Sequence, residues 1–363
     1  MSRRLAAVLL LAAGAARAHV VVQQPGLRQL LQSSATTAIV EVASPIRMWS
    51  APDGSDRQEY FTLRTVETIA GEAPPARFDV FPHAEGLPGW QPGDTVLIFL
   101  ESTASRPELS RLAARFPYFT IQPPGQEWKL AGADGEAIRS AVVGYRDLGA
   151  KTAAAAAPAL RGLLLRSLRS GSAPLRDDAM SELVRARDAH ALFMALFPDA
   201  SNVAPFSALL ARDAGLPVTT RVALARVLDG VHGFDANATI RGFTAEPLGT
   251  TERVQLVRAA AAAQDAGLSA WLASLLVAPD ATLRREAAYA LGHPWHAEHA
   301  RALAERTSDP DPAVARAALR SLGAMESPEA SAILQRIAAG DPGFLRQLAE
   351  AELRRGAAAQ PGP

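Results

Sequence analysis

A segment of thirteen residues occurs twice near the end of the chain, and this repeat limits the possible folds more than any other feature. The first copy covers residues 280–292 and the second covers residues 311–323, an offset of 31 residues. Each copy begins with an aspartate that suits a helix N-cap and ends with Leu-Gly, where glycine suits a left-handed helix end. Between them, apolar residues recur at helical spacing. Helices this short cannot bury an apolar face alone, so the repeat predicts a stack of helices.

Each repeated helix is followed by a second segment of helical periodicity, over residues 298–307 and 328–339. A third copy covers residues 341–355, and three of its polar residues suit the cap of a stack: Glu350, Glu352 and Arg354. Helical segments separated by Pro or Asp-Pro continue back to Pro158. The sequence therefore predicts an all-α region over residues 150–356.

The two copies resemble the HEAT-repeat family. The first copy matches the family's motif nearly completely, and the matching residues are Asp280, Leu283, Arg284, Ala287, Leu291 and Gly292. The second copy departs at Ala315, where the family usually has arginine. The resemblance covers residues 280–355 and implies a superhelical α-solenoid. Such solenoids generally bind proteins or peptides on an extended concave surface, so the resemblance also implies a protein or peptide partner.

The region before Gly149 has the pattern of β-strands. Short segments rich in β-branched and aromatic residues are separated by Pro, Gly and Asp, and they cover residues 38–42, 60–66, 77–81 and 95–100. Strands at this spacing predict a small antiparallel barrel or sandwich over residues 19–149. We therefore expect an α+β multidomain protein in which this β domain precedes a HEAT-like solenoid and residues 357–363 form a disordered tail.

The β region also resembles the OB-type barrel of netrin-like domains, a family that includes metalloprotease inhibitors. The resemblance covers residues 19–145 and depends on a short leader, a helix and a first strand in which valine and glutamate alternate. It implies an inhibitor-like module that binds a secreted protease. The family normally fixes its leader with cysteines, whereas this chain contains none.

Residues 1–18 have the pattern of a secretory signal peptide. Two arginines precede a short apolar run, and Ala16-Arg17-Ala18 supplies small residues at the −3 and −1 positions of a cleavage site. Lysine occurs only at Lys129 and Lys151, which is typical of a GC-rich bacterium. We expect a periplasmic or secreted bacterial protein that does not insert into the membrane once the signal is cleaved.

The charge balance argues against nucleic acid as the partner. The chain has 37 basic and 37 acidic residues, so it lacks the basic excess that attraction to phosphates needs. Four arginines in the two repeats are nevertheless expected to form a basic ridge, and they are Arg284, Arg285, Arg316 and Arg320. A ridge of this kind suits an acidic protein partner.

Histidines are the candidate metal ligands. Cleavage after Ala18 would leave His19 at the mature N-terminus, where its amine and imidazole can chelate copper if a second histidine such as His83 is near. A denser cluster contains His293, His296 and His299, with Glu298 between the last two. The spacing of His296 and His299 suits one face of a zinc-binding helix. The alternative is a solvated turn between paired helices.

Motifs of known catalytic chemistry do not occur in the sequence. There is no Gly-x-Ser-x-Gly elbow, no cysteine, no His-Glu-x-x-His and no phosphate loop that ends in Gly-Lys. The sequence therefore predicts an exported, non-catalytic protein-binding scaffold without a cofactor. Two alternatives stay open at this stage: a metal-binding protein or enzyme that uses the histidines, and a protease inhibitor.

Overall fold

The computed structural model describes residues 25–54, 56–82, 89–123, 128–149, 151–340 and 343–359. The chain forms two compact units that divide between Lys129 and Leu130. The predicted signal peptide and the candidate ligands His19 and His83 lie outside the described residues. Within the described ranges, no helix combines the length and the hydropathy of a membrane-spanning segment.

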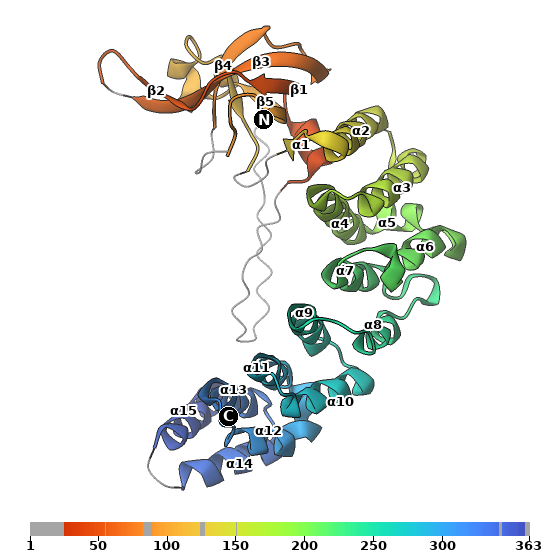
Figure 1. Ribbon diagram of the computed structural model, residues 1–363, viewed down its shortest axis with the longest axis vertical. Helices are drawn as coiled ribbons and strands as arrows, with labels where there is room; N and C mark the ends of the chain where they lie inside the picture. Colours follow the sequence, from red (N-terminus) through yellow and green to blue (C-terminus); the bar gives the residue numbers. More distant parts are fainter. Residues whose placement is uncertain are drawn as a thin grey trace. The chain divides into compact units, whose positions relative to one another are not determined.

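The first unit is a small β-barrel, preceded by the short helix α1 (Leu27–Ser33). Five strands close the barrel in the order β1-β3-β4-β6-β5, and β5 pairs back to β1. Figure 1 labels β1, β3, β4 and β5. The bounds of the five strands are β1 Thr36–Val42, β3 Arg57–Gly71, β4 Arg77–Pro82, β5 Thr95–Ser102 and β6 Tyr118–Thr120. The predicted α+β class, with a β-barrel before a helical repeat region, is thereby confirmed.

One pair of strands differs from the antiparallel pattern that the sequence predicts. β4 and β6 pair in parallel, whereas the other pairs of the barrel are antiparallel. The reason is geometric: strand direction cannot alternate at every pair of a closed ring of five strands, so one pair must be parallel. The chain reaches β6 from β5 through two 3₁₀ helices, η1 (Thr103–Ser105) and η2 (Pro107–Leu112).

The barrel core explains the apolar strand sequences. Alternate residues of β1 and β5 are buried in one cluster, among them Ala38, Val40, Val96 and Ile98. The register of β1 on β3 shifts twice, and such irregularities bend a strand enough for a barrel to close. Gly71 ends β3 with φ +78°, and a Cβ there would lie 2.0 Å from the Ala35 carbonyl oxygen. This position requires glycine.

Two further strands are too short for a periodic pattern to predict. They are β2 (Arg47–Ser50), which pairs with the start of β3, and β7 (Trp128–Lys129), which pairs with β5. A second aromatic cluster lies near β2 and η2. Its centre is Phe116, which packs edge-on against Trp49 at 5.6 Å between ring centroids.

The second unit consists of helices. They are α2 (Gly132–Leu148), α3 (Ala153–Arg169), α4 (Ala173–Asp188), α5 (His190–Leu196), α6 (Ala200–Ser207), η3 (Ala208–Leu210), η4 (Arg212–Ala214), α7 (Val218–Leu228), η5 (Val231–Gly233), α8 (Ala236–Thr244), α9 (Thr250–Ala261), α10 (Ala266–Ser274), η6 (Leu275–Val277), α11 (Ala281–Ala290), η7 (Pro294–His299), α12 (Ala300–Arg306), α13 (Pro312–Ala324), α14 (Pro328–Ala338) and α15 (Phe344–Ala359).

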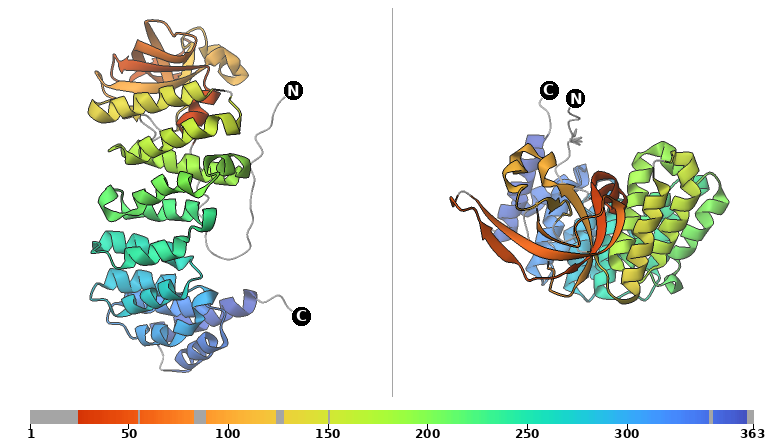
Figure 2. Two further views of the ribbon diagram at one scale, coloured as in Figure 1. Left: turned by 90° about the vertical axis from the view of Figure 1, so that its right-hand side faces the viewer. Right: turned by 90° about the horizontal axis from the view of Figure 1, so that it is seen from above.

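These helices stack in two layers (Figures 1 and 2). One layer contains α4, α7, α9, α11, α13 and α15, each packed against the next. We call these the inner helices, because they lie on the concave side of the curved stack in Figure 1. The outer layer contains α6, α8, α10, α12 and α14. The arrangement is that of a HEAT-like solenoid, in agreement with the prediction.

The boundary between the units lies earlier than the change in composition indicates. The predicted domains meet between residues 149 and 150, whereas α2 belongs to the helical unit. A Cβ at Gly144 of α2 would lie 2.4 Å from the side chain of Leu163 on α3. The hydroxyl of Tyr145 donates a hydrogen bond of 3.3 Å to Asp178 on α4. At the other end, α15 continues to Ala359 and includes part of the predicted tail.

The glycines of the Leu-Gly motif do not adopt the left-handed conformation that the sequence predicts, and Gly323 lies within α13. A close contact with the next inner helix explains them instead. A Cβ on Gly292 would lie 3.2 Å from the Cα of Ser321 on α13. In the next copy, a Cβ on Gly323 would lie 2.8 Å from the Cβ of Glu352 on α15. Glu352 is therefore buried between α13 and α15, whereas the sequence predicts it on a polar cap.

Candidate protein-binding face

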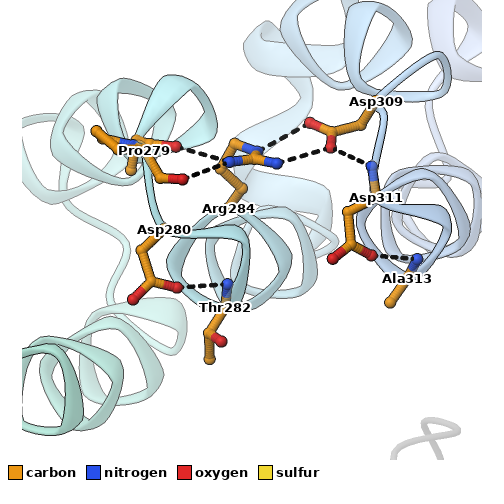
Figure 3. A network of polar contacts seen from close by, with 8 residues as sticks. Pro279, Asp280, Thr282, Arg284, Asp309, Asp311 and Ala313 are labelled. Carbon is orange, nitrogen blue, oxygen red and sulfur yellow. Dashed lines mark hydrogen bonds and ion pairs between the residues drawn. The ribbon is translucent and has the colours of Figure 1, made fainter.

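The start of each inner helix is fixed by an aspartate cap. The backbone N–H of Thr282 donates a 2.7 Å hydrogen bond to Asp280, and that of Ala313 donates an equivalent one to Asp311 (Figure 3). The bond from Thr282 lowers the pKa of Asp280. Because both caps hold the same position of the motif, residues 31 apart occupy equivalent places on α11 and α13.

Arg284 lies at the junction of the two repeats, not on a free surface. Its Nε and Nη2 each donate a 2.9 Å hydrogen bond to Asp309, and its Nη1 donates to the carbonyls of Ala278 and Pro279 (Figure 3). The side chain of Arg284 is 13% exposed and that of Asp309 is 1% exposed. The Arg284 guanidinium lowers the pKa of Asp309. We call this pair the junction clamp, and it removes Arg284 from the predicted ridge.

The other three predicted arginines do reach the surface of the inner helices. The side chain of Arg285 on α11 is 38% exposed, and Arg316 and Arg320 on α13 are both exposed. The guanidinium of Arg316 lies 5.9 Å from the centroid of the Phe344 ring on α15. Arg285 and Arg316 are equivalent residues of the repeat.

Two more residues of this surface escaped the sequence prediction. Gly249 is the N-cap of α9 and stands 31 residues before Asp280, so the repeat spacing extends one inner helix further back. This spacing makes Arg258, Tyr289 and Arg320 equivalent. Arg258 and Tyr289 are exposed. The spacing of N-caps was the signal that could have found them. We call the set Arg258, Arg285, Tyr289, Arg316 and Arg320 the arginine face.

One carboxylate lies within the arginine face. Glu286 accepts a 2.9 Å hydrogen bond from Arg258 on the neighbouring helix α9 and one of 3.2 Å from Arg285. Burial opposes ionisation of Glu286, but the hydrogen bonds from the two arginines outweigh it and lower its pKa. The carboxylate therefore stays ionised and joins α9 to α11.

The predicted histidine cluster forms a hydrogen-bond network around the buried Ser269 of α10. The Ser269 hydroxyl donates to Glu298 at 3.0 Å and lies 2.8 Å from Nδ1 of His296 and 2.9 Å from Nε2 of His299. A hydroxyl offers one donor and two acceptor sites, so one donated and two accepted hydrogen bonds satisfy it. These contacts join η7 to α10, and His296 is completely buried.

Burial also controls the protonation of these histidines. It lowers the pKa of His296, while the backbone of Ala261 and the carboxylate of Glu298 act in the opposite direction. It likewise lowers the pKa of His293, whose ring stacks on Trp295 at 4.4 Å. Among the residues that the structure describes, no three His, Cys, Asp or Glu side chains form a group that could hold a metal ion.

Comparison with known families agrees with the geometry of the C-terminal helices. A family model of HEAT repeats matches residues 268–354, which run from α10 into α15 and contain both copies of the motif. A search of curated proteins found no match. The C-terminal part of the chain therefore consists of HEAT repeats.

Proposed function

We propose that this protein is an exported, non-catalytic scaffold that binds a protein or peptide partner on its inner helices. The observation that carries the proposal is the repetition of one exposed face on successive inner helices. The same positions of α9, α11 and α13 carry exposed side chains in register at intervals of 31 residues. Repeats of this kind generally mediate contacts between proteins, because stacked units present a long continuous surface.

The first unit, the β-barrel, has an accessory role in the proposed scaffold. Its strand order, closed by β5 on β1 with β4 and β6 parallel, supports the OB-type part of the resemblance, since the OB fold is a five-stranded Greek-key barrel. Inhibition of a secreted protease stays a prediction, because the mature end near residue 19 lies outside the described residues.

Photo-crosslinking in the native host tests the scaffold. A photoreactive amino acid replaces Thr282, exposed on the inner helix α11, or Ser331, exposed on the outer helix α14. We expect the inner position to capture one polypeptide of unchanged mass and the outer position to capture none. Equal capture at both positions, or a captured polypeptide that is chemically altered, would contradict the proposal.

Export is tested by the mass of the natively expressed protein. We expect a periplasmic or secreted chain that starts at His19. A native mass spectrum of the same sample also reports bound metal. Stoichiometric copper or zinc would favour the metalloprotein alternative over the scaffold.

A further inference from the structure

The arginine face is positively charged although the whole chain is neutral. It carries four arginines and encloses one carboxylate, that of Glu286, which leaves a net charge of +3. The chain as a whole has 37 basic and 37 acidic residues. The arginine face is therefore a local positive excess on three successive inner helices.

Two of the four arginines form no ion pair within the described residues, although the charge of Arg320 also acts on the buried carboxyl of Glu352. Within the described residues, neither Arg316 nor Arg320 has a carboxylate within ion-pair distance. By contrast, Arg284 is committed to the junction clamp, and Arg301 on the outer helix α12 pairs with Glu329 at 2.6 Å. A guanidinium that contacts an aromatic ring still has donors for a carboxylate, which it can bind through two parallel hydrogen bonds.

The spacing of the repeats favours an extended ligand. Packed helices lie about 8–10 Å apart, so equivalent residues of α11 and α13 repeat at about that interval. An extended polypeptide advances about 3.3 Å per residue, and every third side chain therefore recurs at about 10 Å. Carboxylates at every third position would meet one arginine on each helix, with Tyr289 between Arg258 and Arg320.

The chain's own terminal segments do not fit this surface. Residues 1–24 and residues 356–363 contain no aspartate or glutamate. Their sequences offer no acidic side chain to the arginine face, so the carboxylates must come from elsewhere. Nucleic acid also offers anions, but a net charge of +3 on a neutral chain is small for phosphate binding.

We propose that the partner of this scaffold presents an extended acidic segment, with carboxylates at about every third residue, to the arginine face. This inference depends on the proposed scaffold function and specifies the chemistry of its partner. Binding would weaken with salt, because the exposed arginines are screened by ions.

Fluorescence anisotropy with defined peptides tests the inference on the full mature protein. The probe is a labelled peptide of five Asp-Ser-Gly units. One comparator has asparagine in place of aspartate, another has the same five aspartates in a single run, and a third is a single-stranded DNA of equal charge. We expect the spaced acidic peptide to bind most tightly. Equal or tighter binding of any comparator would overturn the inference.

Matched double variants locate the binding surface. Arg316→Gln with Arg320→Gln removes two charges from the arginine face, and Arg301→Gln with Arg336→Gln removes two from the outer helices α12 and α14. We expect the inner pair to weaken binding of the probe about tenfold and the outer pair less than about twofold. Equal losses would contradict the inference. Circular dichroism melting checks that both variants fold.

The two proposals fail in different ways. If Thr282 still captures one partner in the crosslinking experiment while the spaced acidic peptide does not bind, the scaffold stands and the acidic partner is wrong. If neither the crosslink nor the peptide complex forms, the scaffold itself is wrong.

Discussion

The junction between α11 and α13 and the junction between α13 and α15 are built differently, although the same motif starts both. The first contains the junction clamp of Arg284 and Asp309. In the second, the residues 31 positions later are Ala315 and Gly340, which cannot form it. The second junction instead buries Glu352, which accepts a 2.7 Å hydrogen bond from Arg355. The same motif can therefore precede a junction with a buried ion pair or one with a buried carboxyl bonded to an exposed arginine.

The largest effect is expected from breaking the clamp. Arg284→Ala leaves the carboxylate of Asp309, 1% exposed, without its cation. Removal of one partner of a buried ion pair costs about 3–5 kcal/mol. Urea unfolding would measure the loss, and hydrogen exchange would show reduced protection of α13 to α15. A loss comparable to that of an exposed pair would mean that the clamp does not hold the junction.

Transfer of the clamp to the second junction is the converse experiment. Ala315→Arg alone should destabilise, because position 315 is buried and Gly340 offers no carboxylate. Addition of Gly340→Asp should recover about 0.5–3 kcal/mol, the usual coupling energy of residues in contact. The double-mutant cycle measures this coupling in free energy of unfolding. Additive effects would show that the two positions do not meet.

Glu352 predicts a pH dependence specific to the second junction. Burial raises its pKa, and the nearby Arg355 and Arg320 only partly oppose this. A carboxyl with a raised folded pKa adds stability below its unfolded value, about 4.5, and that stability is lost as the pH rises through the folded pKa. Glu352→Gln should therefore lose less stability than the wild type between pH 4.5 and 7. If the wild type and Glu352→Gln lose the same stability over this range, the carboxyl of Glu352 does not have a raised pKa in the folded protein.

His296 predicts the opposite dependence in the outer layer. Its pKa is lowered by burial, so the unfolded chain takes up a proton at a higher pH than the folded one. Stability should fall as the pH drops below about 6.5. The groups that face this imidazole are Ser269, His293, Glu298 and His299. His296→Asn keeps a donor toward Ser269 and should reduce the slope of stability against pH between about pH 5 and 6.5. An unchanged slope would mean that His296 does not cause it.

The smallest effect is expected at an exposed pair. Arg301 is 87% exposed where it meets Glu329, and such pairs contribute about 0.2–1 kcal/mol. Arg301→Ala should change the free energy of unfolding by less than about 0.5 kcal/mol. A loss as large as that of Arg284→Ala would remove the contrast between buried and exposed pairs.

The sequence allowed prediction of the parts of the fold that depend on neighbours along the chain. The caps Asp280 and Asp311 and the four main strands carry local signals. The predicted left-handed conformation of Gly292 and Gly323 is wrong, because a close contact with the next helix requires these glycines instead. The role of Arg284 could not be predicted, because its partner Asp309 lies in a loop 25 residues away. The same holds for His296. Its polar turn sequence predicts a surface position, but it is buried and contacts Ser269 on another helix.

The sequence also did not predict some element boundaries and the shortest elements. α4 and α5 are separate helices although no proline or glycine divides them, because Ala189 leaves helical geometry at φ −91° and ψ 63°. α2 lies with the helices because its apolar face meets α3, a contact that composition does not reveal. In the candidate site, three of the four predicted ridge arginines reach the surface as expected. Arg258 and Tyr289 could have been predicted only from the 31-residue spacing of the helix N-caps.

The junction clamp also has a mechanical consequence. In a stack where each repeat contacts only its neighbours, bending occurs first at the junctions with the weakest contacts. Arg285 and Arg316 stand on the two helices that the clamp joins. The clamp should therefore make this junction stiffer than a junction without a buried ion pair. When the stack bends, the distance between Arg285 and Arg316 should change less than the distance between equivalent residues of other inner helices.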